Sequence, residues 1–391
     1  MWIKNNLKTG NTISVLDKNI LDEVKSFHES FSEYKPTPLA SLDRLAEKFC
    51  VSKLYVKDES YRFGLNSFKV LGGTFAIGKY LAGKLGKSIA ETPFNEFKKP
   101  EVRKQIGDIT FATATDGNHG RGVAWMARQL GYQARVYMPE GTTQNRLDHI
   151  LEENARASIT DFNYDDTVRY VAEQAALNGW EVIQDTSWEG YKDVPTWIMQ
   201  GYSTLVQEIV EQLKEEKPTH VFLQAGVGAF AAVIANGFSR IYSDKPPKII
   251  IVEPEKANCF YRSAANGKIT PVSGNMHTIM AGLACGEPNP VAWSILKETA
   301  DFFITTTDNI AAKGMRILGN PLKGDPVVIS GESGAVTAGI LSLIATDSEY
   351  EDLKKAIGLD EESKVVLIST EGDTDPQMYR KIVWDGEFQS I

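Results

Sequence analysis

The sequence predicts an α/β protein with doubly wound, mostly parallel sheets, and three observations lead to this prediction. From about residue 53 onward, short runs rich in Val, Ile, Leu and Phe recur along the chain. Stretches of helical periodicity separate these runs, and no internal repeat or low-complexity tract interrupts the alternation. At 391 residues the chain is long enough for about two or three domains. Strands that alternate with helices are typical of parallel sheets covered by helices on both faces.

The predicted strands are nearly continuous in apolar residues, as expected for strands buried on both faces of a sheet. The residues between them have helical spacing; in 167–178, for example, Val168, Val171 and Ala175 recur on one side. Ligands bind such sheets at the carboxyl ends of the strands, so we expect functional residues in the loops that follow them. The predicted strands cover residues 54–57, 109–113, 134–138, 180–184, 220–224, 248–253 and 364–369.

Composition and charge limit the classes of partner. The chain has 42 Lys and Arg against 51 Asp and Glu, a formal charge of −9, which disfavours binding to nucleic acid or to an anionic membrane. Its longest uncharged stretch, 221–238, is interrupted by Gln224, Asn236 and several glycines, so we expect no membrane span. The first residues lack the apolar core of a signal peptide. We therefore expect a cytoplasmic protein.

Three cysteines, Cys50, Cys259 and Cys285, are too few and too scattered for a disulfide framework or a zinc site. No second His or Cys stands at a metal-ligand spacing from His119, so we expect no metal. A disulfide between Cys259 and Cys285 stays open, because both cysteines follow segments that we place near strand ends.

The loop 225–229, Ala-Gly-Val-Gly-Ala, lies between a predicted strand and a helix rich in Ala, Val and Ile. Glycines let a ligand approach the backbone, and a helix start offers N–H groups to an anion. We therefore predict a phosphate cradle formed by Gly226, Val227, Gly228 and Ala229. The alternative is a tight turn without a ligand. The loop has neither the GxGxxG spacing of dinucleotide folds nor the Lys-Ser/Thr of a P-loop.

Lys69 lies near the start of an apolar helical segment, next to Phe68 and Val70. Apolar surroundings disfavour the charged form of an amine, so we expect a lowered pKa and a nucleophilic Lys69. The alternative is a lysine whose amine extends from a helix end into water. The nucleophilic interpretation gains weight only in combination with a phosphate site.

The segment 116–122, Asp-Gly-Asn-His-Gly-Arg-Gly, places polar side chains among glycines ahead of a helix that we predict at 123–130. Asp116 or Asn118 would be enough to cap that helix through a local turn. Because one cap does not need four polar side chains, the pattern favours a functional loop.

Asp116 and Asp185 each follow the end of a predicted strand. If both strands belong to the same sheet edge, the two carboxylates can face one crevice and serve in proton abstraction and leaving-group protonation. The alternative, which we favour for Asp185 taken alone, is that each acid caps the turn after its strand.

Together these motifs resemble the fold-type II pyridoxal-phosphate enzymes. The shared features are Ser-Phe-Lys at 67–69, Gly-Asn-His-Gly at 117–120, Gly-Val-Gly at 226–228 and Ser-Thr-Glu-Gly-Asp at 369–373. The resemblance runs in colinear order from about Tyr34 to Asp385. Longer stretches resemble the diaminopropionate ammonia-lyases within that family, namely 57–69, 115–125, 184–191, 195–202, 280–290 and 369–375.

The resemblance implies pyridoxal 5'-phosphate as the cofactor and assigns residues to it. Lys69 would form a Schiff base with the cofactor aldehyde, and Asn118 would bond the phenolic oxygen. The backbone of residues 226–229 would hold the phosphate. Ser369 or its neighbour Thr370 would meet the pyridine nitrogen with a hydroxyl, which gives a moderated electron sink suited to elimination.

The resemblance also implies a lyase that eliminates ammonia from 2,3-diaminopropionate and yields pyruvate and two ammonia. Dehydratases of hydroxy-amino acids usually carry Ser where this chain has Asp116, and a carboxylate suits a substrate with an ammonium side chain. Asp116, and Asp185 on the opposite face of the substrate, would be bases at Cα. The alternative is a serine or threonine dehydratase with the same cofactor. The preference between D- and L-substrates stays open.

The family pattern predicts two domains. Residues 1–80 and 190–391 would form a large cofactor-binding domain, and 81–189 a small α/β domain. The cofactor would lie in the cleft between them, and closure of the small domain would exclude water. We expect a homodimer that acts on a small amino acid.

Overall fold

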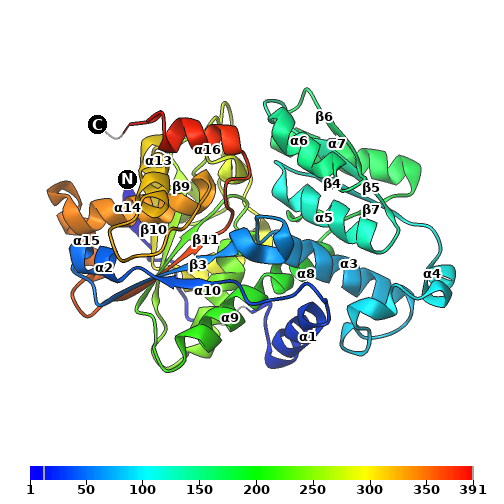
Figure 1. The fold of residues 1–391 in the computed structure, drawn as a ribbon, viewed down its shortest axis with the longest axis horizontal. Coiled ribbons are helices and arrows are strands. Elements are labelled where there is room, and N and C mark those ends of the chain that lie inside the picture. The colour runs from blue at the N-terminus through cyan, green and yellow to red at the C-terminus, as the bar shows by residue number, and fades with distance from the viewer. Residues whose placement is uncertain (12–13, 390–391) are drawn as a thin grey trace. The chain divides into compact units, whose positions relative to one another are not determined.

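The computed structural model describes residues 1–11 and 14–389. Contacts between residues divide the chain into two compact units (Figure 1). The described residues of 1–13, 37–67 and 208–391 form the large unit, and those of 14–36 and 68–207 form the small unit. Helix α9 (Ser203–Leu213) begins in the small unit and ends in the large one.

The described residues of the large unit form a seven-stranded sheet of order β1-β10-β9-β8-β11-β3-β2. The inner strands run parallel, and the edge strands β1 and β2 run antiparallel to their neighbours. The inner strands β8, β9, β10 and β11 are buried almost throughout, as expected where helices cover both faces. The strands are β1 (Trp2–Lys4), β2 (Leu39–Ser41), β3 (Lys53–Asp58), β8 (His220–Gln224), β9 (Lys248–Pro254), β10 (Phe302–Thr306) and β11 (Lys364–Ser369).

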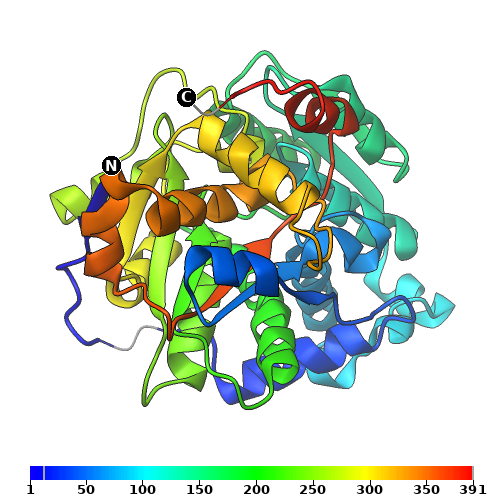
Figure 2. The same cartoon turned by 60° about the vertical axis from the view of Figure 1, so that its left-hand side comes forward.

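Two helices of the large unit, α13 and α14, pack in direct backbone contact, and Figure 2 shows them crossing in gold and orange. A Cβ at Gly314 would overlap the Ala335 carbonyl oxygen, and one at Gly339 would overlap the Ile310 carbonyl oxygen. Only glycine therefore fits at these two positions. The helices are α2 (Asp43–Phe49), α10 (Ala229–Ile241), α11 (Cys259–Asn266), α12 (Pro290–Thr299), α13 (Asp308–Gly319), α14 (Glu332–Thr346), α15 (Glu351–Ile357) and α16 (Pro376–Val383).

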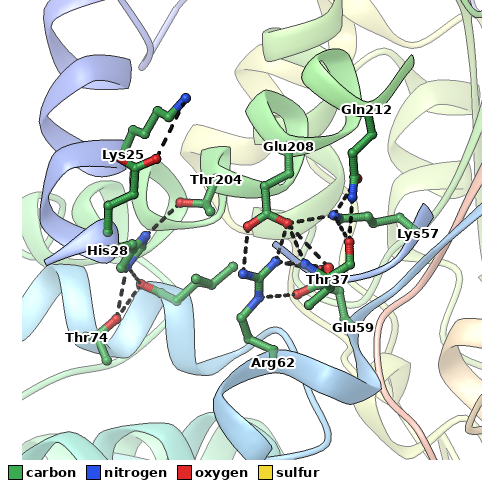
Figure 3. A network of polar contacts seen from close by, with 12 residues as sticks. Lys25, His28, Thr37, Lys57, Glu59, Arg62, Thr74, Thr204, Glu208 and Gln212 are labelled. Carbon is green, nitrogen blue, oxygen red and sulfur yellow. Dashed lines mark hydrogen bonds and ion pairs between the residues drawn. The ribbon is translucent and has the colours of Figure 1, made fainter. Parts of the chain in front are cut away.

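A network of buried charges ties β3 and the 3-10 turn η1 (Glu59–Gly64) to α9 in the large unit (Figure 3). The side chains of Lys57, Glu59, Arg62 and Glu208 are at most 3% exposed. Arg62 donates to Glu59 at 2.8 Å and to Glu208 at 2.7 and 2.9 Å. Lys57 Nζ donates to Glu208 Oε2 at 2.6 Å. Two cations thus neutralise two carboxylates inside this buried network.

The described residues of the small unit form a four-stranded parallel sheet of order β6-β5-β4-β7. Helix α3 packs on α5 and α8, and α7 packs on β4. The strands are β4 (Thr110–Ala114), β5 (Gln133–Met138), β6 (Arg156–Ile159) and β7 (Glu181–Val182). The helices are α1 (Lys18–Glu29), α3 (Val70–Lys84), α4 (Pro100–Ile106), α5 (Asn118–Gln129), α6 (Gln144–Leu151), α7 (Tyr164–Asn178) and α8 (Asp193–Gly201).

The predicted fold class, α/β with mostly parallel sheets, is confirmed, and each predicted strand overlaps an observed one. The strand predicted at 180–184 is shorter, since β7 covers only Glu181–Val182. Strand β10 was not predicted, although its residues are as apolar as those of the predicted strands, and neither were β1, β2 and β6. Strands β1 and β2 have three residues each, and β6 is mostly exposed, so these carry little apolar pattern.

The predicted loop at 116–122 and helix at 123–130 were wrong in their boundary. Helix α5 begins at Asn118, so residues 118–122 form its first turns. Gly117, at φ +148°, makes the turn out of β4 without a longer loop. Only glycine adopts this conformation readily.

The division by contacts differs from the predicted domain boundaries. Residues 68–80 and 190–207, predicted for the large domain, group with the small unit, because α3 packs against α5 and α8. Residues 14–36 also join the small unit, because α1 packs against α3 and α8.

Within the described residues, no helix has the length and apolar character needed to cross a bilayer.

Candidate active site

Two acids follow neighbouring strands of the small unit. Strands β4 and β7 are parallel and paired, with Phe111 opposite Glu181. Asp116 comes two residues after β4 and Asp185 three residues after β7. Because carboxyl ends of parallel strands meet at one edge, both acids belong to the same edge of this sheet.

Lys69 pairs with Asp185 inside the small unit. It is the N-cap residue of the apolar helix α3, as predicted, and its Nζ lies 2.6 Å from Asp185 Oδ2. The Lys69 side chain is 19% exposed and that of Asp185 3%. Burial alone would lower the pKa of Lys69, but Asp185, helped by Tyr202 and Asp116, holds that pKa above its usual value. The predicted lowered pKa was therefore wrong, since the apolar neighbours act against a closer carboxylate.

The Asp185 carboxylate is held in place on its other side. Its Oδ1 accepts from the Tyr164 hydroxyl at 3.0 Å and from Gln184 Nε2 at 3.2 Å. Gln184 is itself fixed, since its Oε1 accepts from Thr113 and from the Ala114 N–H. Burial raises the pKa of Asp185, but the Lys69 ammonium outweighs it, so the pKa lies well below the ordinary value. Asp185 is thus an ionised and oriented carboxylate.

Asp116 is bordered by a buried arginine. Arg146 Nη1 lies 3.6 Å from Asp116 Oδ2 and donates to its backbone oxygen at 3.3 Å.

His119, in the first turn of α5, donates from Nε2 to the Ile183 carbonyl at 2.7 Å. Burial lowers the pKa of His119, so the imidazole is neutral and its Nδ1 is an acceptor. Asn118, predicted for the cofactor, is the first residue of α5 and is half-buried.

Three buried polar atoms of this cluster form no hydrogen bond within the described residues. They are Asp116 Oδ2, His119 Nδ1 and Tyr202 Oη. Tyr202 is fully buried, and its ring lies 4.7 Å from that of Phe68. An unsatisfied buried polar group costs about 1–3 kcal/mol, so this cluster gains free energy from a ligand that completes its hydrogen bonds.

The large unit carries the predicted phosphate loop between β8 and α10. Gly228 has φ +88°, and a Cβ there would overlap the Phe260 ring. A Cβ at Gly226 would lie 2.7 Å from the Gly282 carbonyl oxygen. Within the described residues, the N–H groups of Gly226, Val227 and Gly228 donate to no backbone or side-chain acceptor. N–H groups without an acceptor at a helix start fit a phosphate.

The structure distinguishes the two hydroxyls proposed for the pyridine nitrogen. Ser369 is the last residue of β11 in the large unit, Thr370 follows it, and both are buried. The Ser369 hydroxyl donates to the Glu371 carbonyl at 3.2 Å. Thr370 Oγ1 accepts from Gln224 Nε2 at 2.8 Å, which leaves the Thr370 hydrogen without an acceptor in the described residues. Thr370 is therefore the better donor to a ligand.

Three neighbours of this cluster were not predicted from the sequence, namely Tyr164, Arg146 and Tyr202. Tyr202 lies in the stretch 195–202 that carried the family resemblance, which was its only signal.

Among the described residues, no group of three or more His, Cys, Asp and Glu side chains can hold a metal. Cys50, Cys259 and Cys285 are thiols.

Comparison with known families agrees with this geometry. A family profile described as pyridoxal-phosphate dependent enzyme matches residues 31–371. Diaminopropionate ammonia-lyase of Escherichia coli strain K12 is 50% identical over 385 residues, covering 98% of this chain and 96% of that protein. The Salmonella typhimurium enzyme of the same name is 49% identical, with coverages of 97% and 95%.

Solved structures give the same result. The Escherichia coli enzyme in complex with an aminoacrylate–PLP azomethine reaction intermediate matches with a TM-score of 0.93 and 48% identity, covering 100% of this chain and 98% of that one. The same enzyme in complex with D-serine matches with a TM-score of 0.94 and 48% identity, covering 99% and 97%.

Proposed function

The chain belongs to the pyridoxal-phosphate dependent enzymes and, among them, to the diaminopropionate ammonia-lyases, and from this premise we propose that it eliminates ammonia from 2,3-diaminopropionate. Pyruvate and two ammonia are the products. The observation that supports this most is the pairing of Lys69 with Asp185 beside a second acid, Asp116. The elimination needs an imine-forming amine, a base at Cα and a carboxylate for a second ammonium.

The residues present suit pyridoxal phosphate as cofactor. The N–H groups of Gly226, Val227 and Gly228 lack acceptors in the described chain and would hold the phosphate. Thr370 would donate its hydroxyl hydrogen to the ring nitrogen, and Asn118 would bond the phenolic oxygen. When bound, this cofactor supplies an aldehyde for the lysine and a ring that withdraws electrons from Cα.

Different residues of the chain would carry out the separate proton transfers. Asp185 is ionised, so Oδ2 can accept the Cα proton once the Lys69 ammonium no longer occupies it. Lys69 has a raised pKa and carries a proton that the departing amine needs when the Cβ–N bond breaks. Asp116, whose Oδ2 accepts no hydrogen bond in the described chain, would bind the substrate side-chain ammonium or serve as base from the other face.

The test is a comparison of substrates with purified holoenzyme. We expect D- or L-2,3-diaminopropionate to release two ammonia for each pyruvate, with a kcat/KM well above that for either serine enantiomer. A higher kcat/KM for serine or threonine would favour the second candidate, a dehydratase. We consider this second candidate because a structure of the similar Escherichia coli enzyme contains D-serine.

We also propose that the protein works in the cytoplasm as a homodimer. The formal charge of −9 suits an enzyme of small polar metabolites that is repelled by anionic membranes. Sedimentation equilibrium of the holoenzyme measures its mass directly. A mass of one chain, 43.2 kDa, would contradict the dimer.

A further inference from the structure

A cavity of about 280 Å³ lies in the large unit, and none of its lining residues belongs to the proposed site. It is bordered by α2, residues 313–318 of α13, the end of α14 and the segment 320–325. Apolar side chains make most of the wall, with Leu45, Phe49 and Leu318 buried and Leu322 40% exposed at the rim. A mostly apolar, concave wall of this kind is typical of small-molecule sites.

The charged groups of this cavity leave a net positive charge unpaired. Lys48 and Lys313 both line it, and neither forms an ion pair with any described residue. Asp325 lines it too, but its two oxygens accept the N–H groups of Arg44 and Leu45 at 2.8 and 2.9 Å. The carboxylate therefore caps α2, and the two ammonium groups remain available to an anion.

Helix dipoles explain only one of these lysines. Lys48 lies in the last turn of α2, where the dipole favours a cation. Lys313 lies in the second turn of α13 (Asp308–Gly319), where the dipole gives no such preference. Lys313 therefore has neither a carboxylate partner among the described residues nor a stabilising helix dipole.

The size of the cavity limits the ligand. A water molecule occupies about 30 Å³ in the liquid, so the cavity accommodates about nine or ten non-hydrogen atoms. A bare inorganic anion would leave the apolar wall in contact with water, and a long-chain lipid would not fit. We propose that this cavity binds a small amphipathic monocarboxylate, with its hydrocarbon on the apolar wall and its carboxylate between Lys48 and Lys313.

Calorimetric titration of the holoenzyme with octanoate tests the proposal. We expect saturable binding of octanoate and much weaker binding of octylamine and octanol, because these lack the anion. The double variant Lys48→Gln/Lys313→Gln should weaken octanoate binding at least ~10-fold, since it removes both charge-assisted hydrogen bonds. Leu322→Trp, at the rim, should weaken it by blocking the entrance.

Matched controls separate this site from general effects. Lys18→Gln/Lys104→Gln removes two exposed lysines elsewhere and should leave octanoate binding unchanged. Turnover of 2,3-diaminopropionate reports folding in every variant, and none of the changed residues belongs to the proposed catalytic cluster. Absent binding in the wild type, or equal binding in wild type and double variant, would overturn the proposal. The proposal would also fail if the wild type were dimeric and bound no octanoate while the Leu322→Trp variant were monomeric. That result would show that a second copy of the chain covers the cavity.

Discussion

Each unit of the protein contains a cluster of buried charges, and the two clusters differ in how completely their polar atoms are satisfied. In the large unit, Arg62 and Lys57 together bond two carboxylates, and no side-chain nitrogen or oxygen of the four charged residues lacks a partner. In the small unit, the Lys69–Asp185 pair lies beside three buried polar atoms without hydrogen bonds in the described chain. A complete network needs nothing further and fixes structure, whereas an incomplete one gains from a ligand.

We expect the largest effect on turnover when Lys69, the amine of the incomplete cluster in the small unit, is removed. Lys69→Ala should lower kcat by ~10⁴-fold or more, because one group acts as imine-forming amine and proton carrier. The visible absorbance of the holoenzyme should disappear as well. The melting temperature checks folding. Normal turnover with the absorbance band intact would remove Lys69 from the cofactor site.

Substituting the two acids separately should distinguish their roles. Asp116→Asn and Asp185→Asn keep size and a hydrogen bond but remove basicity, so each should lower kcat by ~10²–10⁴-fold on the enantiomer whose proton it takes. Steady-state kinetics on D- and L-2,3-diaminopropionate measure this. Equal losses on both enantiomers for Asp116→Asn would indicate that it binds the leaving ammonium. Near-normal kcat for both variants would exclude the acids from catalysis.

Breaking the complete network should cost stability and not chemistry. Arg62→Met leaves Glu59 and Glu208 buried with too little positive charge, which should lower the free energy of unfolding by about 3–5 kcal/mol. Denaturant unfolding of both proteins measures the loss. The matched control is Arg169→Met, because Arg169 pairs with Asp166 on the surface and should lose at most about 1 kcal/mol. A similar loss in both variants would contradict the structural role of the network.

Glu253 is a third case, a buried carboxylate that forms no ion pair with any described residue. It is fully buried and accepts the N–H groups of Phe260 and Tyr261, yet burial raises its pKa to about 8. The unfolded chain loses this proton near the ordinary value of 4.5, so the folded state holds more protons between these pH values. Stability should therefore fall as pH rises from about 4.5 to about 8. In Glu253→Gln, the melting temperature should fall by a few degrees less over this pH range than in the wild type. Parallel plots of melting temperature against pH for the two proteins would contradict this prediction.

The smallest effect concerns the two neighbouring hydroxyls of the large unit. Thr370→Val should weaken pyridoxal phosphate binding by about fivefold, because it removes a hydroxyl hydrogen that has no acceptor in the described chain. Ser369→Ala should change the affinity less, since that hydroxyl already donates to Glu371. Absorbance titration of the apoenzyme compares the two. The opposite order would assign the ring nitrogen to Ser369.

Local patterns in the sequence were enough to predict seven of the described strands, the helix after Lys69 and the glycine loop between β8 and α10, because each depends on neighbours along the chain. The apolar runs at 220–224 and 364–369 match β8 and β11 residue for residue. The position of Gly226 and Gly228 between a strand and a helix was likewise readable without a structure.

The electrostatics of the site could not be predicted in the same way. Lys69 pairs with Asp185, 116 residues away in sequence, and this carboxylate reverses the pKa shift that the apolar neighbours suggested. Arg146 contacts Asp116 from helix α6, 30 residues further along the chain. Tyr202 stands in no polar motif, and only the missing hydrogen bond at its buried hydroxyl draws attention to it. Such partnerships arise from tertiary packing.

The position of β11 has a consequence for synthesis of the protein. This strand lies between β8 and β3, and it comes from residues 364–369, near the end of the chain. Until the ribosome has released it, β3 and β8 each present an unpaired edge to the cell, and β1 cannot pair before residues 302–306 emerge. At about 5–20 residues per second, β1 and β3 wait on the order of 15–60 seconds for their partners. The small unit is mostly one continuous stretch and has all its strands by then, whereas the large unit cannot complete its sheet until β11 emerges.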